Sequence, residues 1–219
     1  MTGTTHRLAG ISAGMAAVEI LQMNDLKIQT ALLTGCIIGS LLPDIDNPQS
    51  TISYKVPCIR AIYSLLQKMI RIFADLLPGR KKEYVKSSIG HRGLTHSLFT
   101  AFALPALILG LGKIVSFQTH MLSLGLMLGL LSHILLDLFS GGIRLFLPFS
   151  PYNVKMARIK TGGALEWIIR IGFMMVLSYL TIESIKELHI IDSILEMIFS
   201  NPPSMYTPTL EEEILWSLW

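Results

Sequence analysis

Histidines stand beside apolar stretches of this sequence in positions where side chains could bind a metal ion. The stretch GHRGLTHSLFT, residues 90–100, holds His91 and His96 on either side of a glycine, directly before an apolar run. We expect Thr95 to cap a helix there, with His96 in its first turn. Imidazole is the commonest metal-binding side chain, so both histidines are candidate ligands. The alternative is ordinary capping chemistry with two solvated histidines.

Two further motifs add carboxylates to these imidazoles. His133 and Asp137, in LSHILLDLFSGG, are four residues apart and therefore share one face of a helix, so both could reach one metal ion. Polar groups inside an apolar helix are costly unless compensated, which favours a functional role over a structural His–Asp pair. In LLPDIDNPQS, an extended segment would point Asp44 and Asp46 the same way off a helix end. A turn is the alternative for these two residues.

The elements that position these residues are predicted to be those of a membrane protein. Of the 219 residues, 51% are hydrophobic and 15% are charged, whereas about a quarter are charged in soluble domains. Mean hydropathy is +0.55. The net charge of +3 gives no global basic character that would indicate nucleic acid binding. Cys36 and Cys58 are isolated, which indicates neither a disulfide framework nor a zinc knuckle.

Apolar segments recur along the chain and predict an all-α integral membrane protein with about five membrane-embedded helices. They are residues 8–18, 28–43, 97–112, 121–136 and 165–182. The first segment follows His6 and is expected to be retained as a short helix rather than cleaved as a signal peptide. The third and fourth are joined by a short turn, so we expect them to be antiparallel neighbours.

The composition becomes basic between the second and third apolar segments. Nine Lys or Arg residues fall between Lys55 and Arg92. Apolar residues recur at helical spacing in residues 59–77 with basic residues between them, a pattern typical of an amphipathic helix on an anionic membrane surface. A helical insertion that packs on the core is the alternative. Residues 79–86 are expected to form a solvated basic loop. We expect one domain at residues 1–200, which contains the basic insertion at residues 49–90. A tail at residues 201–219 follows it.

Crossing at each of the five segments would bring the candidate site residues to one membrane face. They are His6, Asp44, Asp46, His91, His96, Asp137 and Glu166. Fourteen of the eighteen Lys and Arg residues fall on the same side: Arg7, the nine from Lys55 to Arg92, and Arg144, Lys155, Arg158 and Lys160. By the positive-inside rule this face is cytoplasmic. The amphipathic insertion and the site are therefore expected on the cytoplasmic face.

The motifs HRGLTHS, LLPDIDNP and LSHILLDLFSGG together resemble the YdjM-like family of bacterial membrane-bound metal-dependent hydrolases, inner-membrane proteins sometimes described as LexA-regulated. The similarity runs from His6 to about Arg170. More remotely, the order His, Asp, His, His-x-x-x-Asp is similar to the zinc-dependent phospholipase C and nuclease superfamily. This sequence lacks the early tryptophan of that superfamily and has fewer histidines after the last motif. The family's motif residues match His6, Asp44, Asp46, His91, His96, His133, Asp137 and Glu166.

The resemblance implies a metal-dependent hydrolase in the bacterial inner membrane, and we expect phosphoester hydrolysis. Imidazole and carboxylate ligands favour Zn²⁺, with Mn²⁺ as the alternative, and two ions about 3.5 to 4 Å apart would activate a water. The expected metal ligands are His6, Asp44, Asp46, His91, His96, His133 and Asp137. The expected catalytic residues are His96, Glu166 and Arg92. The residues expected to bind the substrate phosphate are Arg144 and Arg158.

A basic amphipathic segment beside the site indicates a lipid or lipid-linked phosphoester, above all a phospholipid, as the substrate. Glu166 could instead simply pair with Arg170, four residues further on. Two other functions stay open. A lipid or ion transporter would also place His and Asp within the membrane, but near its middle. A non-catalytic protein with a structural metal would need a closed coordination shell. The sequence leaves the oligomeric state open.

Overall fold

The computed structural model describes residues 1–47, 50, 53, 57–90, 92–114 and 119–187. Residues 1–180 form one compact unit, and residues 181–219 form a second unit of which only residues 181–187, the end of a helix, are described. His91 and the tail at residues 201–219 therefore lie outside the described residues. Within the described part all the long elements are helices, which confirms the all-α prediction.

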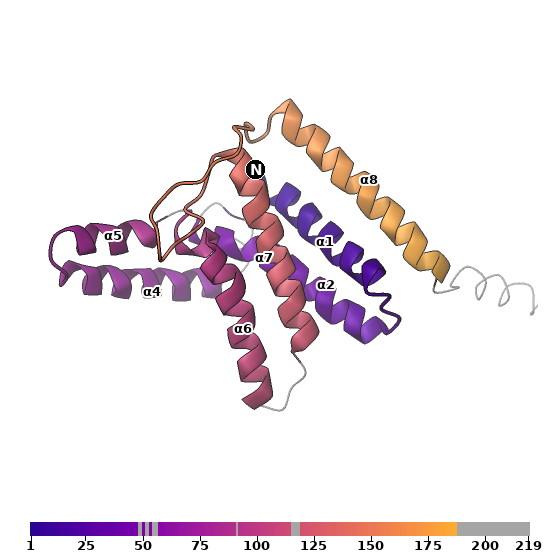
Figure 1. Cartoon of the computed structure of the whole chain (residues 1–219), viewed down its shortest axis with the longest axis horizontal. Coiled ribbons are helices and arrows are strands. Elements are labelled where there is room, and N and C mark those ends of the chain that lie inside the picture. Colours follow the sequence, from indigo (N-terminus) through magenta and orange to yellow (C-terminus); the bar gives the residue numbers. More distant parts are fainter. Residues whose placement is uncertain (48–49, 51–52, 54–56, 91, 115–118, 188–219) are drawn as a thin grey trace, which may run out of the picture. The chain divides into compact units, whose positions relative to one another are not determined.

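Each of the five predicted apolar segments forms a helix (Figure 1). These helices are α1 Gly3–Ile20, α2 Leu26–Leu41, α6 Leu98–Ile114, α7 His120–Ser140 and α8 Ala164–Glu187. Three helical stretches among the described residues are long and apolar enough to cross a membrane: Leu26–Asp46, His120–Ser140 and Ala164–Lys186. Helix α6 is a shorter apolar helix. The described residues thus supply three candidate spans, and the predicted number of five is not confirmed.

Helices α2 and α7 form the most closely packed pair in the compact unit. A Cβ atom added at Gly39 would lie 2.9 Å from the backbone nitrogen of Leu130, and one at Gly129 would lie 2.8 Å from that of Ser40. Real Cβ atoms essentially never approach other atoms so closely, so only glycine permits this contact between backbones, as in small-residue contacts between membrane helices. The contact is made by glycines four residues apart on both helices: Gly35 and Gly39, and Gly125 and Gly129.

Buried apolar side chains form clusters around these helices. A smaller cluster joins α1 to α2 through Val18, Leu32 and Cys36. Helix α1 also approaches α2 through Gly10 and Gly14, which face Ser40 and Cys36. The larger cluster is centred on α7 and consists of Ala101, Leu126, Leu130, Ile134, Leu138 and Ile143. Together these contacts hold α1, α2 and α7 side by side (Figure 1).

The two segments before and after the basic insertion are short 3-10 helices. Asp44 and Asp46 lie in η1 Leu42–Asp46, so the extended conformation considered for them is wrong and the turn is right. The segment η2 Leu94–His96 precedes α6. Thr95 is therefore not the helix cap that we predicted. The hydroxyl of Ser97 instead accepts a hydrogen bond from the Thr100 amide at 3.3 Å at the start of α6.

The basic insertion folds as a helical hairpin of α4 Pro57–Asp75 and α5 Arg80–Ser88 (Figure 1). The amphipathic helix predicted at residues 59–77 is confirmed as α4, whereas the loop predicted at residues 79–86 is wrong. Lys, Arg and Glu are good helix formers, and α5 is tied back to α4 by Asp75. Its carboxylate lies 2.8 Å from the Lys82 ammonium and 2.7 Å from that of Lys86. These two hydrogen-bonding lysines lower the pKa of Asp75 to about 2.

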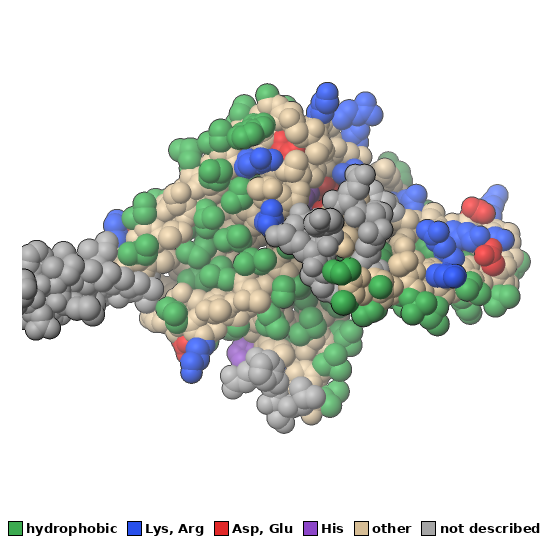
Figure 2. Space-filling view, turned by 180° about the vertical axis from the view of Figure 1, so that it is seen from behind, with side chains coloured by type: hydrophobic (Ala, Val, Ile, Leu, Met, Phe, Trp, Pro, Cys, Tyr) green, Lys and Arg blue, Asp and Glu red, His purple; other side chains and the backbone are tan. Residues whose placement is uncertain are grey.

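One face of α4 is apolar and exposed. Figure 2 shows hydrophobic side chains along one edge of the hairpin and lysine and arginine side chains gathered along the other. Helix α4 also contacts η1, and burial together with the nearby Asp46 carboxylate raises the pKa of Tyr63. The hairpin thus packs on the segment that carries two predicted ligands while it leaves an apolar face uncovered. The exposed apolar residues are Ile62, Leu65, Leu66, Met69, Ile72, Phe73 and Leu76.

Candidate metal centre

The candidate ligands come together where the first turn of α1, the last turns of α7, η1 and η2 meet. Two groups of residues each offer one ligand atom per residue, with all three atoms within 4.8 Å of one another. The first group is His6, His133 and Asp137, and the second is Asp44, His96 and His133. All of these residues except Asp44 are buried. Side chains from four elements that are distant in the sequence therefore meet at one buried position.

His133 is common to both groups, and its hydrogen bonding fixes which ring nitrogen can bind a metal. Its Nδ1 lies 2.6 Å from the Ser40 carbonyl oxygen. A carbonyl oxygen can only accept a hydrogen bond, so Nδ1 carries the proton and Nε2 of the neutral ring has a free lone pair. His133 is 0% exposed, and Nε2 has no hydrogen-bond partner among the described residues. A buried lone pair without a donor is costly in a protein interior, and a metal ion would satisfy it.

His6 lies against His133 in the same buried layer. The two imidazole rings are stacked with their centroids 3.8 Å apart and their planes 15° apart. His6 is 1% exposed, and its Nδ1 also has no hydrogen-bond partner within the described part of the chain. Although an isolated histidine near a chain start is usually solvated, this one is placed by the first turn of α1 inside the unit.

Asp137 presents its two carboxylate oxygens to different histidines. Oδ1 lies 3.5 Å from His6 Nε2, while Oδ2 lies 3.4 Å from His96 Nε2 and 3.8 Å from His133 Nε2. The hydroxyl of Ser140 donates to Oδ1 at 2.9 Å, which orients the carboxylate. The side chain of Asp137 is 4% exposed. One buried carboxylate thus faces three imidazoles through two oxygens.

Asp44 completes the second group and opens it toward the outside. Its Oδ1 lies 3.8 Å from His133 Nε2 and 3.9 Å from His96 Nε2, and its side chain is 20% exposed. Ligands about 2.0 to 2.2 Å from a tetrahedral zinc ion are separated from one another by about 3.3 to 3.6 Å. The separations at Asp44 and Asp137 are close to that range or slightly longer. The donor set and its spacing therefore fit a metal ion.

Asp46, a predicted ligand, is in neither of the two groups. Its Oδ2 accepts hydrogen bonds from the Arg92 amide and from the Thr95 hydroxyl, each at 3.2 Å. The Thr95 hydroxyl also lies 3.0 Å from His96 Nδ1, so that the other ring nitrogen, Nε2, faces Asp44 and Asp137. Asp46 thus holds the segment that carries His96. Arg92 has a φ of 58°, a conformation that is strained for a residue with a side chain, and the hydrogen bond to Asp46 helps to retain it.

Of the three predicted phosphate-contacting or catalytic arginines, Arg92 lies beside the centre and Arg144 shares a pocket with Arg92. Arg92 Nε is 3.5 Å from Asp137 Oδ2, and its guanidinium donates to the Ser140 hydroxyl at 3.2 Å. Arg144 donates to the Ser87 carbonyl of α5 at 2.7 Å. Arg158 is exposed and does not line the pocket that Arg92 and Arg144 share. That polar pocket of about 270 Å³ is lined by Arg92, Gly141, Gly142, Ile143, Arg144 and Asn153.

Glu166, predicted as a catalytic residue, is in neither ligand group and anchors the start of α1. The carboxylate accepts hydrogen bonds from the Thr2 amide, the Thr2 hydroxyl and the Thr5 hydroxyl, all at 2.6 to 2.7 Å. It also accepts one from the Gly162 amide at 2.7 Å, and Arg170 lies 3.7 Å away, as in the pairing considered from the sequence. Glu166 is 0% exposed. Its contacts fix the turn of α1 that contains His6.

Sequence reasoning missed two features that position the centre. The glycines of α2 and α7 set the distance between those helices, and their spacing of four residues in two apolar segments was a visible signal. The Ser40 carbonyl orients His133, but a backbone acceptor leaves no mark in the sequence.

Comparison with known proteins finds a relative and a family for this chain. The chain is 29% identical over 181 residues to the uncharacterized protein YvsG of Bacillus subtilis (strain 168), an alignment that covers 82% of this chain and 93% of the relative. No solved structure matches the chain. The YdjM inner membrane protein family matches residues 1–192, which contain every described candidate ligand. The chain therefore belongs to the YdjM inner membrane protein family.

Proposed function

We propose that this protein is a membrane-bound metal-dependent hydrolase that cleaves a phosphoester of a lipid at the cytoplasmic face of the bacterial inner membrane. The observation that carries the proposal is the lone pair of His133 Nε2, buried without a hydrogen-bond partner among the described residues. The carboxylates of Asp44 and Asp137 each lie 3.8 Å from it. Buried imidazole and carboxylate groups in this arrangement are the donors of a metal site.

The donor set favours Zn²⁺, with Mn²⁺ as the alternative, because Mg²⁺ prefers oxygen ligands alone. We propose two ions. His133 has only one ring nitrogen available and can bind one ion, while Asp137 faces His6 with one oxygen and His96 with the other. His6 and Asp137 would hold one ion, and Asp44, His96 and His133 would hold the other. When bound, the metal would supply a Lewis acid and a water of lowered pKa.

The surrounding residues support a phosphoester as the substrate. Arg92 and Arg144 line the polar pocket next to Asp137, and guanidinium groups bind phosphate oxygens through two parallel hydrogen bonds. Asp46 and Thr95 hold His96 in place, so His96 can serve as a ligand or exchange a proton with the substrate. We assign Glu166 the positioning of His6 and give it no part in the reaction. Arg158, exposed at the surface, is left without a role in the pocket.

The partial exposure of Asp44 favours a catalytic site over a structural one. A structural metal site is closed by four protein ligands, whereas a catalytic site keeps one position open to water or substrate. The other grouped ligands are buried, but the Asp44 side chain is 20% exposed, which leaves one side of the centre accessible. The basic hairpin α4–α5, with its uncovered apolar face, would place that side at the membrane surface.

Metal content and turnover of ligand variants test the proposal. We expect His133→Ala and Asp137→Ala each to lose bound metal and hydrolysis of phospholipid vesicles, because a missing ligand leaves the centre incomplete. His120→Ala is the matched control: His120 is exposed at the opposite end of the same helix, α7, and should keep both properties. The measurements are metal analysis of the purified protein and phosphate release.

Two outcomes would contradict this function. Stoichiometric metal retained in both His133→Ala and Asp137→Ala would mean that the centre is not the one described. A wild-type protein that binds no metal under any loading condition would favour a transporter that uses His and Asp for protons or ions. Retained folding of each variant is checked by its elution from size-exclusion chromatography in detergent.

A further inference from the structure

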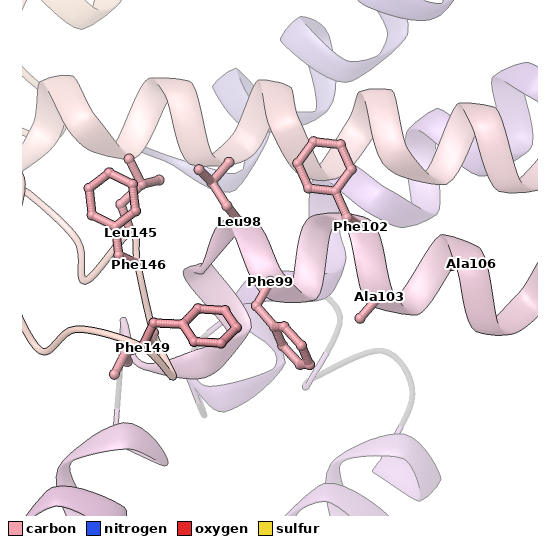
Figure 3. Close-up of a pocket in the computed structure, with 9 residues that line it drawn as sticks. Leu98, Phe99, Phe102, Ala103, Ala106, Leu145, Phe146 and Phe149 are labelled. Atoms are coloured by element: carbon pink, nitrogen blue, oxygen red, sulfur yellow. The ribbon is translucent and has the colours of Figure 1, made fainter.

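A second, wholly apolar cavity lies close to the candidate centre. Its volume is about 550 Å³, within the range of small-molecule binding sites. One wall is the first half of α6, which begins two residues after His96, and the other is the segment 145–149 (Figure 3). The Leu98 amide donates to the Leu145 carbonyl at 2.9 Å and joins the two walls. The lining residues are Leu98, Phe99, Phe102, Ala103, Ala106, Leu145, Phe146, Leu147 and Phe149.

The aromatic side chains of this cavity are unusually exposed. Figure 3 shows the rings of Phe99 and Phe149 next to each other, and they meet edge to face with their centroids 6.2 Å apart. Phe99 is 45% exposed and Phe149 is 84% exposed. An exposed aromatic patch of this size marks a binding site for an apolar group, and the cavity offers no polar side chain to a ligand. Its occupant must therefore be apolar over the whole length that enters.

Two consecutive segments of the chain line the cationic pocket beside the metal centre and one wall of this cavity. Residues 141–144 contribute to the polar pocket with Arg92, and residues 145–149 contribute to the apolar cavity. Arg144 and Leu145, one on each side of this division, are consecutive, so their Cα atoms are about 3.8 Å apart. A cationic pocket and an apolar cavity that adjoin along one segment match a molecule with an anionic group next to a hydrocarbon chain.

We propose that the apolar cavity binds an acyl chain of the phospholipid whose phosphate group occupies the polar pocket at Arg92 and Arg144. This inference rests on the proposed function and specifies how that substrate is selected. A peptide segment fits less well, since its backbone amides and carbonyls would meet no hydrogen-bonding side chain in the cavity. An acyl chain has no such groups, and it is the apolar material that surrounds a membrane protein.

The wall of the cavity is also connected to the amphipathic hairpin. The Tyr84 hydroxyl of α5 donates to the Pro148 carbonyl, and Arg144 donates to the Ser87 carbonyl of the same helix. Both contacts hold the segment 143–149 against α5. A lipid that enters from the membrane surface would therefore meet the hairpin and the cavity together.

Photocrosslinking tests the cavity without requiring hydrolysis. The full-length protein is reconstituted into phosphatidylglycerol vesicles that contain a lipid with a diazirine on one acyl chain, and crosslinked peptides are identified by mass spectrometry. Crosslinks to α6 and to residues 145–149 are compared with those to the exposed face of α8 in the same sample. We expect the ratio of these cavity crosslinks to the α8 crosslinks to fall about tenfold or more in Ala103→Trp. A loss of that size corresponds to about two methylene groups of the acyl chain that are no longer buried.

Two further variants control for folding and position. Leu111→Trp puts the same side chain on an exposed position of α6 that does not line the cavity, and its ratio should equal that of the wild type. Phe149→Ala removes an exposed side chain from the wall and should also lower the ratio, even if Ala103→Trp does not fold. An equal ratio in the wild type and in both cavity variants would overturn the proposal.

Turnover separates failure of this inference from failure of the proposed function. Ala103→Trp should lower hydrolysis of long-chain phospholipid about tenfold while leaving hydrolysis of bis(p-nitrophenyl) phosphate, which has no acyl chain, unchanged. An equal loss on both substrates would overturn the acyl-chain site and leave the hydrolase proposal intact. If the wild type hydrolyses neither substrate, the hydrolase proposal fails, and crosslinks that depend on Ala103 and Phe149 still support a lipid site. If inorganic phosphate inhibits hydrolysis of the soluble diester but not hydrolysis of the phospholipid, the arginine pocket binds free phosphate. That result would overturn the link between the pocket and the lipid.

Discussion

Replacing Gly129 by alanine should weaken the metal centre from a distance, because this glycine sets the spacing of α2 and α7. The added methyl group would overlap the Cys36 carbonyl oxygen and lie 2.8 Å from the Ser40 nitrogen. Ordinary contacts at a Cβ atom begin at about 3.4 Å. The two backbones must therefore separate by about 0.6 Å at Ser40 and by more at Cys36. Strain of this kind in a packed core costs about 1 to 3 kcal/mol.

The displacement falls on the residue that orients His133. Ser40 supplies the carbonyl oxygen that accepts from His133 Nδ1 at 2.6 Å, and His133 is one helical turn after Gly129 on α7. Moving Ser40 away lengthens this hydrogen bond and rotates the imidazole relative to Asp44 and Asp137. Loss of an outer hydrogen bond to a ligating histidine typically lowers metal affinity by about 10- to 100-fold. We expect a decrease in that range for Gly129→Ala, without complete loss of binding.

The assay is zinc titration of metal-free protein in detergent, with thermal unfolding measured on the same samples. Two glycines serve as matched controls, because a Cβ atom at Gly110 of α6 or at Gly172 of α8 would meet nothing within 4 Å. Gly110→Ala and Gly172→Ala should bind zinc like the wild type and unfold at the same temperature or slightly higher, since alanine is the better helix former.

If Gly129→Ala unfolds and binds zinc like these two controls, the glycine contact does not control the centre. The contact between α2 and α7 would then be looser than the distances indicate. A variant that unfolds earlier but keeps wild-type zinc affinity would refute only the link between the glycine contact and His133.

Three other perturbations have definite expected outcomes. Glu166→Ala should lower metal affinity to the level of His6→Ala, because buried donors at the start of α1 lose their acceptor; unchanged affinity with abolished turnover would instead make Glu166 catalytic. In a cysteine-free background, a cysteine at position 113 in place of Lys113 should react with an impermeant reagent in intact cells, and one in place of Lys82 should not; the reverse pattern would place the hairpin outside. The pKa of Asp75 is lowered from 3.8 to about 2, so its contribution to the hairpin is present above pH 3.8 and is lost as the pH falls through 2. Amide exchange in α5 should rise over that window in the wild type and not in Asp75→Asn.

The sequence by itself determined the class of the protein and the residue types at the ends of its helices. Long apolar runs with few or no charged residues predict helices for the membrane, and all five such runs are helical. The spacing of His133 and Asp137 placed both on one face of α7, because a helix repeats every 3.6 residues. The amphipathic pattern of residues 59–77 likewise predicted α4. These predictions succeeded because they depend on periodicity and on local chain chemistry.

Local pattern did not decide which acids lie with the histidines. Asp44 and Asp46 look equivalent in the sequence, but the 3-10 turn sends Asp44 to the histidines and Asp46 to the Arg92 amide and Thr95. Glu166 stands at a helix start, as a site residue would. Its carboxylate instead accepts hydrogen bonds from Thr2 at the start of α1. The difference lies in the partners that each carboxylate meets, and those partners come from other elements.

Only the tertiary structure decided how the ligands are held and what lies beside them. The protonated nitrogen of His133 follows from the Ser40 carbonyl, which comes within reach because glycines let α2 and α7 approach. The segment that follows Asp137 lines a cationic pocket and then an apolar cavity, although neither is visible as a sequence pattern. Backbone acceptors and cavities arise from the packing of distant segments, and a residue's type and spacing carry no record of the atoms that will surround it.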